Sequence, residues 1–297
     1  MATETASAPT TTAARGPQQR AARDRGPVRL VLLIAGAFLF IFPFYYMLIG
    51  SLQEDVNSGL SGALPDPSNL TFKNYSDINQ GIDLPGSLLN STILTIGVLL
   101  STLFFGLLAG YSMSVLHYRG RGVAFASVLL VQTIPFQLLM IPLFVLLVRE
   151  YGLGDTYLGM IVPFAIGPTA VFIFRQFFLQ LPRDLFDAAR IDGAGEFTIL
   201  WRIAIPLAKP AILTATMLTF IGPWNDFLWP FLITKDTDLQ PLAVSLANYM
   251  ANLASRAANP FGATLAGACV LAAPVIGLFI VFQRHFTSSD IGSGVKG

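Results

Sequence analysis

One acidic residue, Asp226, interrupts the otherwise uncharged apolar segment Pro210–Thr234. An ionisable side chain is costly within a membrane, so it is interpreted as functional by default. Asn225 precedes it, and Trp224 and Trp229 flank the pair. The carboxylate and the amide can hydrogen-bond the hydroxyl groups of a ligand, while an indole ring can stack on a ring face. A second interpretation places Asp226 at the outer membrane interface beside Trp229, in an aromatic belt. The sequence leaves both interpretations open.

Gln132 and Gln137 are further candidates for ligand contact, in the uncharged stretch Gly122–Val148. Gln132 is expected near the middle of the membrane, but the favoured interpretation is a hydrogen bond between helices, which membrane helices commonly use. No Lys or Arg interrupts any of the apolar segments. A strongly anionic solute is expected to meet such a residue, so the pattern favours a neutral, hydroxyl-rich solute.

The charged segment Arg175–Lys209 carries a different pattern. Pro182 suits the first turn of a helix, and Gly193 stands where a helix can end in a left-handed turn. A second short helix is predicted over Glu196–Ile203, followed by Pro206. The segment is too long for a simple connection and too short for a domain, so it is expected to contact a partner protein.

The first helix of this segment has a predicted apolar patch made of Leu185, Phe186 and Ala189. The small side chains of Ala188 and Ala189 would let another protein approach the backbone closely. A helix, a glycine turn and a second helix together predict a compact knob beside the membrane.

The elements that position these residues are predicted to be membrane helices. Of the 297 residues, 54% are hydrophobic and 12% are charged, which is about half the usual charged share of a soluble domain. A spanning helix needs about 20 mostly apolar residues. The predicted fold is all-α with six spans, in the segments Leu30–Gln53, Leu84–Tyr118, Gly122–Val148, Thr156–Phe174, Pro210–Thr234 and Ala257–Gln283.

Several functions are disfavoured by what the sequence lacks. The single Cys269 and the two distant histidines, His117 and His285, offer no disulfide framework, metal site or catalytic histidine arrangement. No phosphate-binding G-x-x-x-x-G-K-[ST] motif occurs. The net charge of +1 gives no indication of nucleic-acid binding. We therefore predict no catalytic residue, no metal site and no cofactor bound by this chain.

Basic residues predict the orientation because they concentrate in cytoplasmic loops. With the N-terminus inside, only Lys73, Arg149, Lys235 and Arg256 fall outside. Both termini are therefore predicted to be cytoplasmic. The chain divides into a disordered cytoplasmic tail (1–29), a six-span domain (30–284) that contains the loop 182–206, and a cytoplasmic C-terminal tail (285–297).

Two outer segments connect the spans. Glu54–Asp83 is predicted to be an ordered, turn-rich loop, and Leu242–Leu253 a short interfacial helix. In the last span, small residues are expected to allow close helix packing; they are Gly262, Ala263, Ala266, Gly267 and Ala268.

The loop resembles the EAA loop of binding-protein-dependent importer permeases. The resemblance rests on Asp187-Ala188-Ala189, on Gly193 four residues later, and on Ile203 and Ile205-Pro206. Asp187 replaces the usual Glu of that family, and Ile205 replaces the usual Leu. Further similarity to carbohydrate permeases of the maltose-transporter G type lies in three segments, 220–230, 241–249 and 292–297.

This resemblance implies a type I ABC importer permease fold in a bacterial inner membrane, with a cytoplasmic coupling helix between spans four and five. Asp187, Ala188, Ala189, Asp192, Gly193, Ile203 and Pro206 are its implied ATPase-coupling residues. The implied partners are a second homologous permease, two ATPase subunits that use ATP and Mg, an extracytoplasmic sugar-binding protein and membrane lipid. The alternative is an ion- or proton-coupled secondary transporter with Asp226 as its coupling acid, but such a carrier needs no docking knob.

Overall fold

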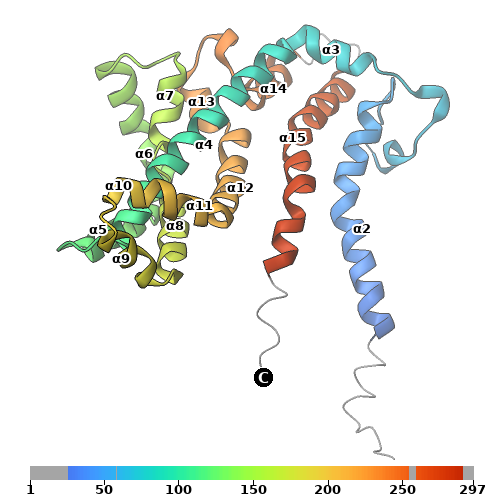
Figure 1. Cartoon of the computed structure of the whole chain (residues 1–297). Helices are drawn as coiled ribbons and strands as arrows, with labels where there is room; N and C mark the ends of the chain where they lie inside the picture. The colour runs from blue at the N-terminus through green and yellow to red at the C-terminus, as the bar shows by residue number, and fades with distance from the viewer. Residues whose placement is uncertain (1–25, 58, 254–258, 290–297) are drawn as a thin grey trace, which may run out of the picture.

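Long apolar stretches form helices here because a helix satisfies every backbone hydrogen bond within its own segment. The computed structural model describes residues 26–57, 59–253 and 259–289 (Figure 1). Within those ranges no strand forms, and one isolated β-bridge pairs Gln53 with Leu70. The predicted tails lie largely outside these ranges, at residues 1–25 and 290–297.

Three helices are long and apolar enough to cross a membrane unaided. They are α2 (Gly26–Ser51), α4 (Leu84–Ser114) and α15 (Pro260–Ser289). Pro43 and Pro274 lie inside α2 and α15 without ending them. These helices cover three of the six predicted spans.

The other three predicted spans are bent pairs. α5 (Arg121–Gln132) meets α6 (Phe136–Phe144), which a π-helical turn extends to Glu150, at 91°. α7 (Tyr157–Ile161) and a 3-10 turn (Val162–Phe164) meet α8 (Pro168–Gln180) at 45°. Residues 196–207, which end in α11 (Ile205–Leu207), meet α12 (Lys209–Asn225) at 74°, and of this pair only α12 belongs to the predicted fifth span. By length and composition the described residues hold up to six spans, in agreement with the predicted number.

Prolines account for the breaks in these pairs. Pro135 immediately precedes α6, Pro168 begins α8, and Pro210 is in the first turn of α12. A proline removes an N–H donor and restricts the residue before it, so a helix tends to end just upstream. α13 (Leu228–Ile233) continues span five beyond a second break at Asp226.

The segment 54–83, predicted to be an outer turn-rich loop, contains a ten-residue helix, α3 (Lys73–Ile82). Tyr75, Ile78 and Ile82 recur at helical spacing along its inner face, against α15 and α4. Its buried Asn74 donates hydrogen bonds to the carbonyls of Ser51 and Gln53. The sequence signal was weak because most residues of α3 are polar.

The second outer segment forms the predicted short helix, as α14 (Leu242–Asn248) and a π-helical turn (Tyr249–Leu253). It is buried rather than interfacial, since Leu242 and Val244 are fully inaccessible to solvent. α14 packs against α4 and α15. In α15, Ala263 and Ala266 are buried, which confirms that small residues there allow close packing.

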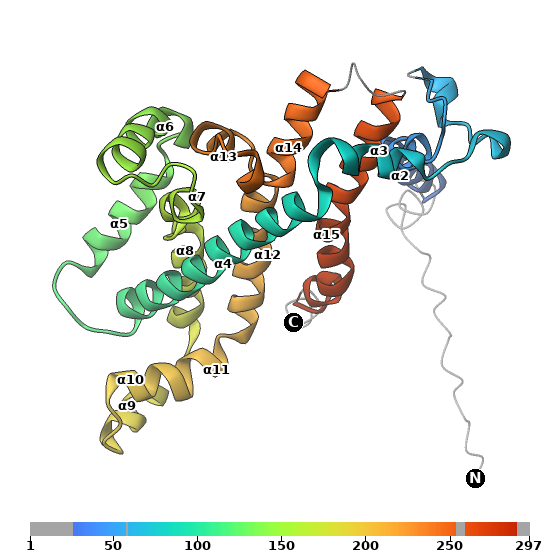
Figure 2. The same cartoon turned by 90° about the horizontal axis from the view of Figure 1, so that it is seen from above.

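α4 is the central helix. Its residues contribute to two clusters of buried apolar side chains, one near its middle and one near its C-terminal end, and Leu84 at its start packs against a third. Figure 2 shows α4 crossing the molecule, with α2 and α15 on one side of it and α5 to α8 on the other. Gly106 and Gly110 allow α8 to approach closely, because a Cβ on Gly110 would lie 2.6 Å from that of Phe174.

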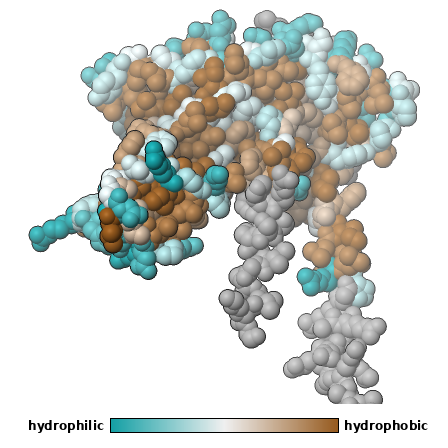
Figure 3. Space-filling view, in the orientation of Figure 1, coloured by the Kyte–Doolittle hydropathy of each residue, from teal (hydrophilic) through white to brown (hydrophobic). Residues whose placement is uncertain are grey.

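The two ends of the molecule differ in what they present. The start of α2, the end of α15 and the segment 183–207 lie toward one end, and α3 lies at the other (Figure 1). Between them the surface is largely hydrophobic (Figure 3). Phe38, Leu39 and Phe40 of α2 are 71%, 71% and 78% exposed, as expected for a surface that faces lipid or another membrane helix.

Candidate functional site

The predicted helix–turn–helix knob is present after α8. α9 (Arg183–Ile191) begins after Pro182 and carries Asp184 in its first turn. α10 (Glu196–Ile199) continues through a π-helical turn (Leu200–Ala204) into α11. We call residues 182–206 the coupling loop. Pro206 lies exposed in α11, and Ile203 packs against the apolar cluster behind it.

Gly193 ends α9 in a left-handed turn, with φ of 83°, as predicted. The N–H of Gly193 bonds to the carbonyl of Arg190, and the N–H of Ala194 bonds to the carbonyl of Ala189. These two hydrogen bonds make a Schellman motif, which satisfies carbonyl groups that the end of a helix leaves free. Asp192, just before the turn, is exposed.

The two faces of α9 have different surroundings. Phe186 and Ala189 of the predicted apolar patch are buried against α4 and α8, while Leu185 is 39% exposed. Ala188 is exposed, but the buried Ala189 offers no surface for a partner's close approach. The outward face also carries the apolar Ile191, which is 86% exposed. Such exposed apolar residues are typical of an interaction surface.

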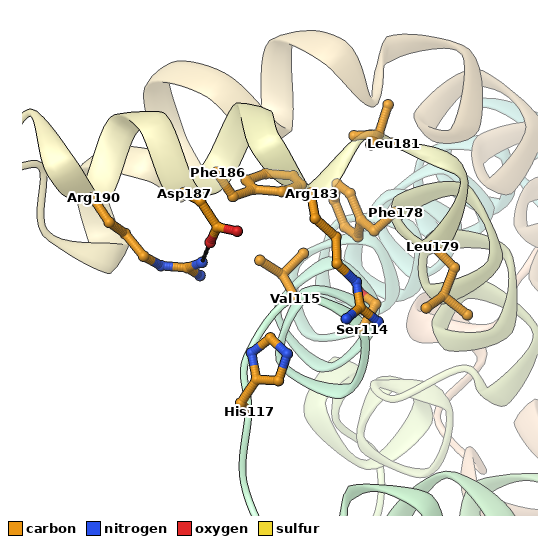
Figure 4. Close-up of a pocket in the computed structure, with 10 residues that line it drawn as sticks. All are labelled: Ser114, Val115, His117, Phe178, Leu179, Leu181, Arg183, Phe186, Asp187 and Arg190. Carbon is orange, nitrogen blue, oxygen red and sulfur yellow. Dashed lines mark hydrogen bonds and ion pairs between the residues drawn. The ribbon is translucent and has the colours of Figure 1, made fainter.

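Charged side chains link the parts of the coupling loop. Arg190 NH1 donates to Asp187 Oδ1 at 2.7 Å, and Arg190 Nε donates to Glu196 Oε1 at 2.7 Å. The other oxygen of Glu196 accepts a hydrogen bond from the hydroxyl of Tyr111 in α4, also at 2.7 Å. The hydrogen bond from Arg190 holds the pKa of Glu196 below its ordinary value. Figure 4 shows Asp187 and Arg190 joined on α9, with Phe186 beside them.

Sequence reasoning missed Arg190, Glu196 and Tyr111. The spacing of Asp187 and Arg190 on one helix face was the available signal. Nothing in the sequence indicated that Tyr111, 85 residues before Glu196, would meet it. The joint between α9 and α4 is closely packed: the cavity beside Phe186 and His117 measures only about 30 Å³.

A larger cavity of about 390 Å³ lies where broken helices meet. It is lined by Phe136, Phe164, Gly222, Pro223, Asn225 and Asp226. Phe136 follows the break before α6, Phe164 precedes α8, and Asp226 separates α12 from α13. Irregular backbone at membrane depth is tolerated where it lines a cavity. We call this space the central cavity.

Asp226 lines the central cavity and also supports α13. Its backbone is extended, with φ of −68° and ψ of 127°. Its carboxyl group lies beside the backbone N–H groups that begin α13, where the partial positive charge of a helix start favours a carboxylate. Asn225, the second polar lining residue, is exposed and donates to the carbonyl of Ile221 at 2.9 Å.

The two tryptophans do not occupy the predicted stacking positions. Trp224 is 4% exposed, stacks on Phe220 and donates its Nε1–H to the carbonyl of Leu271 at 2.8 Å. Trp229 is fully buried and donates to the carbonyl of Gly159 at 3.1 Å. Each indole is held by packing and by one hydrogen bond, which is how buried tryptophans are usually satisfied. The aromatic residues of the central cavity are Phe136 and Phe164 instead.

Gln132 and Gln137 lie outside the lining of the central cavity. Gln132 donates to the hydroxyl of Thr169 at 3.0 Å, a hydrogen bond between α5 and α8. This confirms the interpretation that the sequence favoured for Gln132. Gln137 is exposed on α6. Among the described residues, no group of three His, Cys, Asp or Glu side chains is arranged to hold a metal ion.

Comparison with known proteins agrees with this geometry. Residues 72–288 match the model of the family described as binding-protein-dependent transport system inner membrane component. The chain is 37% identical over 269 residues to the arabinooligosaccharides transport system permease protein AraQ of Bacillus subtilis (strain 168), which covers 88% of this chain and 92% of that protein. It is 29% identical to the lactose transport system permease protein LacG of Rhizobium radiobacter, over 90% of this chain and 95% of LacG.

A solved structure is also similar. A chain from the crystal structure of a bacterial ABC transporter involved in the import of the acidic polysaccharide alginate superposes with a TM-score of 0.78. The two chains are 28% identical, and the match covers 93% of this chain and all of that one. The similarity therefore extends over all the described spans and the coupling loop.

Proposed function

Since the chain belongs to the family of binding-protein-dependent transport system inner membrane components, we propose that it forms half of the pathway by which an ATP-driven importer takes up a neutral sugar. It is a permease subunit of an ABC importer, a multi-pass membrane protein that works with an ATPase and a substrate-binding protein. The observation that carries the proposal is the coupling loop. It presents Asp187, Ala188 and Ile191 outward from one end of the spans.

The proposed solute is an arabinooligosaccharide. Two relatives that are 37% and 35% identical to this chain are permeases for arabinooligosaccharides. A relative for sn-glycerol-3-phosphate is 28% identical. The lining of the central cavity supports a neutral solute, because it contains the carboxylate of Asp226 and the amide of Asn225 but no Lys or Arg. A phosphate or a uronate would meet like charge there.

The complete transporter would contain this chain, a second homologous permease, two ATPase subunits and an extracytoplasmic sugar-binding protein. ATP and Mg would be bound by the ATPase subunits. The exposed apolar faces of α2 and α15 suit a second membrane subunit as well as lipid. The coupling loop would face the cytoplasm together with both termini, and α3 would face outward.

The first experiment tests the energy source. The complete transporter is reconstituted into proteoliposomes, and uptake of radiolabelled arabinotriose is measured with ATP supplied to the ATPase side. A proton gradient is imposed by a pH jump, and uptake should depend on ATP and continue at the same rate when an uncoupler removes that gradient. Uptake that stops with the gradient while ATP is maintained would favour a secondary transporter with Asp226 as its coupling acid.

Specificity is tested in the same vesicles by competition. Excess arabinotetraose should suppress arabinotriose uptake, whereas sn-glycerol-3-phosphate should leave it unchanged. Strong competition by sn-glycerol-3-phosphate would contradict the neutral-solute proposal. Lactose serves as a neutral comparison, because one relative transports it.

A further inference from the structure

Tyr111, near the end of α4, contacts three helices at the coupling loop, α8, α9 and α10. Its ring meets Phe178 of α8 edge-on, with centroids 5.8 Å apart, and Phe186 of α9 at 6.3 Å. Its hydroxyl donates to Glu196 in the first turn of α10. Tyr111 is only 4% exposed, so these contacts are shielded from solvent.

The contacts continue to the outward face of the loop. Glu196 accepts from Arg190, and Arg190 donates to Asp187. Three hydrogen bonds of 2.7 Å thus connect α4 to Asp187. An exposed ion pair alone contributes little to stability. Here the series of hydrogen bonds begins at the buried hydroxyl of Tyr111, and the guanidinium group of Arg190 bonds to the carboxylates of both Glu196 and Asp187.

The backbone gives the coupling loop no direct connection to α4. Going backward from α9, the chain leads through Leu181 into α8; going forward, it leads through Ala208 into α12. α4 reaches the loop only by side-chain contacts. Among those contacts, the hydrogen bond between Tyr111 and Glu196 has a fixed direction and length, which apolar packing alone lacks.

We propose that Tyr111 and Glu196 are positioning residues that fix the coupling loop to α4. Displacement of α9 by the ATPase is then carried into α4 as well as into α8 and α12. α4 also reaches the opposite end, where Asn90 donates to the carbonyls of Asp238 and Gln240. The proposal rests on the proposed function, since it concerns how ATP hydrolysis is coupled to transport.

The test measures sugar transported per ATP hydrolysed in proteoliposomes that contain the complete transporter, with arabinotriose as the probe. Tyr111→Phe keeps the ring and removes the hydroxyl. Glu196→Ala removes both carboxylate oxygens and with them the acceptor of the Tyr111 hydroxyl. Tyr118→Phe is the control, because Tyr118 is exposed and its hydroxyl makes no hydrogen bond within the described part of the chain.

Tyr111→Phe and Glu196→Ala should each lower the transported sugar per ATP about ten-fold, with ATP hydrolysis retained. The double variant should be no worse than the single ones, because both remove the same link. Tyr118→Phe should match the wild type. A wild-type ratio in Tyr111→Phe, or fully additive losses in the double variant, would overturn the proposal.

A second measurement needs no solute. The chain is placed in nanodiscs, and the hydrogen exchange of the backbone amides of residues 187–199 is measured by mass spectrometry. Tyr111→Phe should speed their exchange about ten-fold relative to Tyr118→Phe. Unchanged protection would overturn the link. Failure of the wild type to take up arabinotriose would instead count against the proposed function, and the exchange result would still decide whether the link exists.

Discussion

The role of the left-handed turn at Gly193 in transport can be tested by a substitution that alters no side-chain contact. A Cβ on Gly193 would meet nothing within 4 Å, so only the backbone opposes substitution. Gly193→Val should cost at least about 1 kcal/mol of loop stability, because a β-branched residue disfavours positive φ. We expect lost transport with binding-protein recognition intact, measured as uptake and as ATP hydrolysis stimulated by the loaded binding protein.

Gly195 supplies the control for Gly193. Its φ is −70°, and a Cβ there would also meet nothing within 4 Å. Gly195→Ser should therefore transport normally, since Ser is favoured at a helix N-cap. Gly193→Asn should be milder than Gly193→Val, because Asn tolerates the left-handed region. Normal substrate-stimulated ATP hydrolysis in Gly193→Val would contradict a role for this turn in coupling.

Asp226 has two roles to separate, one in the central cavity and one at the start of α13. Asp226→Asn keeps an oxygen acceptor and should impair uptake modestly. Asp226→Leu removes it, and leaving polar partners unsatisfied costs about 1–3 kcal/mol, or roughly ten-fold in apparent affinity. Initial uptake rates over a range of arabinotriose concentrations measure this. Normal transport by Asp226→Leu would place the substrate contacts elsewhere, for example on the partner permease.

At the scale of elements, the close packing of α4 against α8 can be tested directly by substitution of Gly110. In Gly110→Ala the new Cβ would lie 2.6 Å from the Cβ of Phe174 and 2.9 Å from the N atom of Arg175. Overpacking of this kind typically costs about 1–3 kcal/mol. The thermal unfolding midpoint of the chain in detergent should fall.

Gly36→Ala in α2 is the matched variant. It makes the same chemical change inside a helix, and the added Cβ meets nothing within 4 Å. Ala has the higher helix propensity, so the midpoint should stay or rise. If both variants behave alike, the close approach of α4 and α8 contributes nothing to stability.

At the scale of elements, the sequence predicted what local patterns determine. Apolar length gave the six spans, and a glycine at the correct offset gave the end of α9. It missed α3, because Tyr75, Ile78 and Ile82, although at helical spacing, are the only large apolar residues in a mostly polar segment. It placed Trp224 and Trp229 on a pathway because it could not reveal that their N–H groups meet the carbonyls of Leu271 and Gly159. Contacts between residues far apart in the chain, such as Tyr111 with Glu196, have no local signature.

The orientation of the whole molecule is testable with single cysteines. Cys269 is first replaced by Ala, and Cys is then introduced at Ser61 or at Thr198, both of which are exposed. A membrane-impermeant maleimide should label the Ser61→Cys variant in intact cells. It should label the Thr198→Cys variant only after permeabilisation. The reverse pattern would invert the proposed topology, because it would place the coupling loop outside.

The N-terminal end of α4 cannot complete its contacts until a much later part of the chain has been synthesised. Asn90 bonds to the carbonyls of Asp238 and Gln240, and Ser91 accepts from the N–H of Leu242. These partners are 148 to 151 residues later in the chain. At about 5–20 residues per second, a nascent α4 waits roughly ten to thirty seconds for them. Its polar groups lie within two turns of the helix start, where interfacial water can solvate them meanwhile. A chain released from the ribosome before Leu242 therefore inserts its early spans but keeps this end of α4 hydrated and open to proteases.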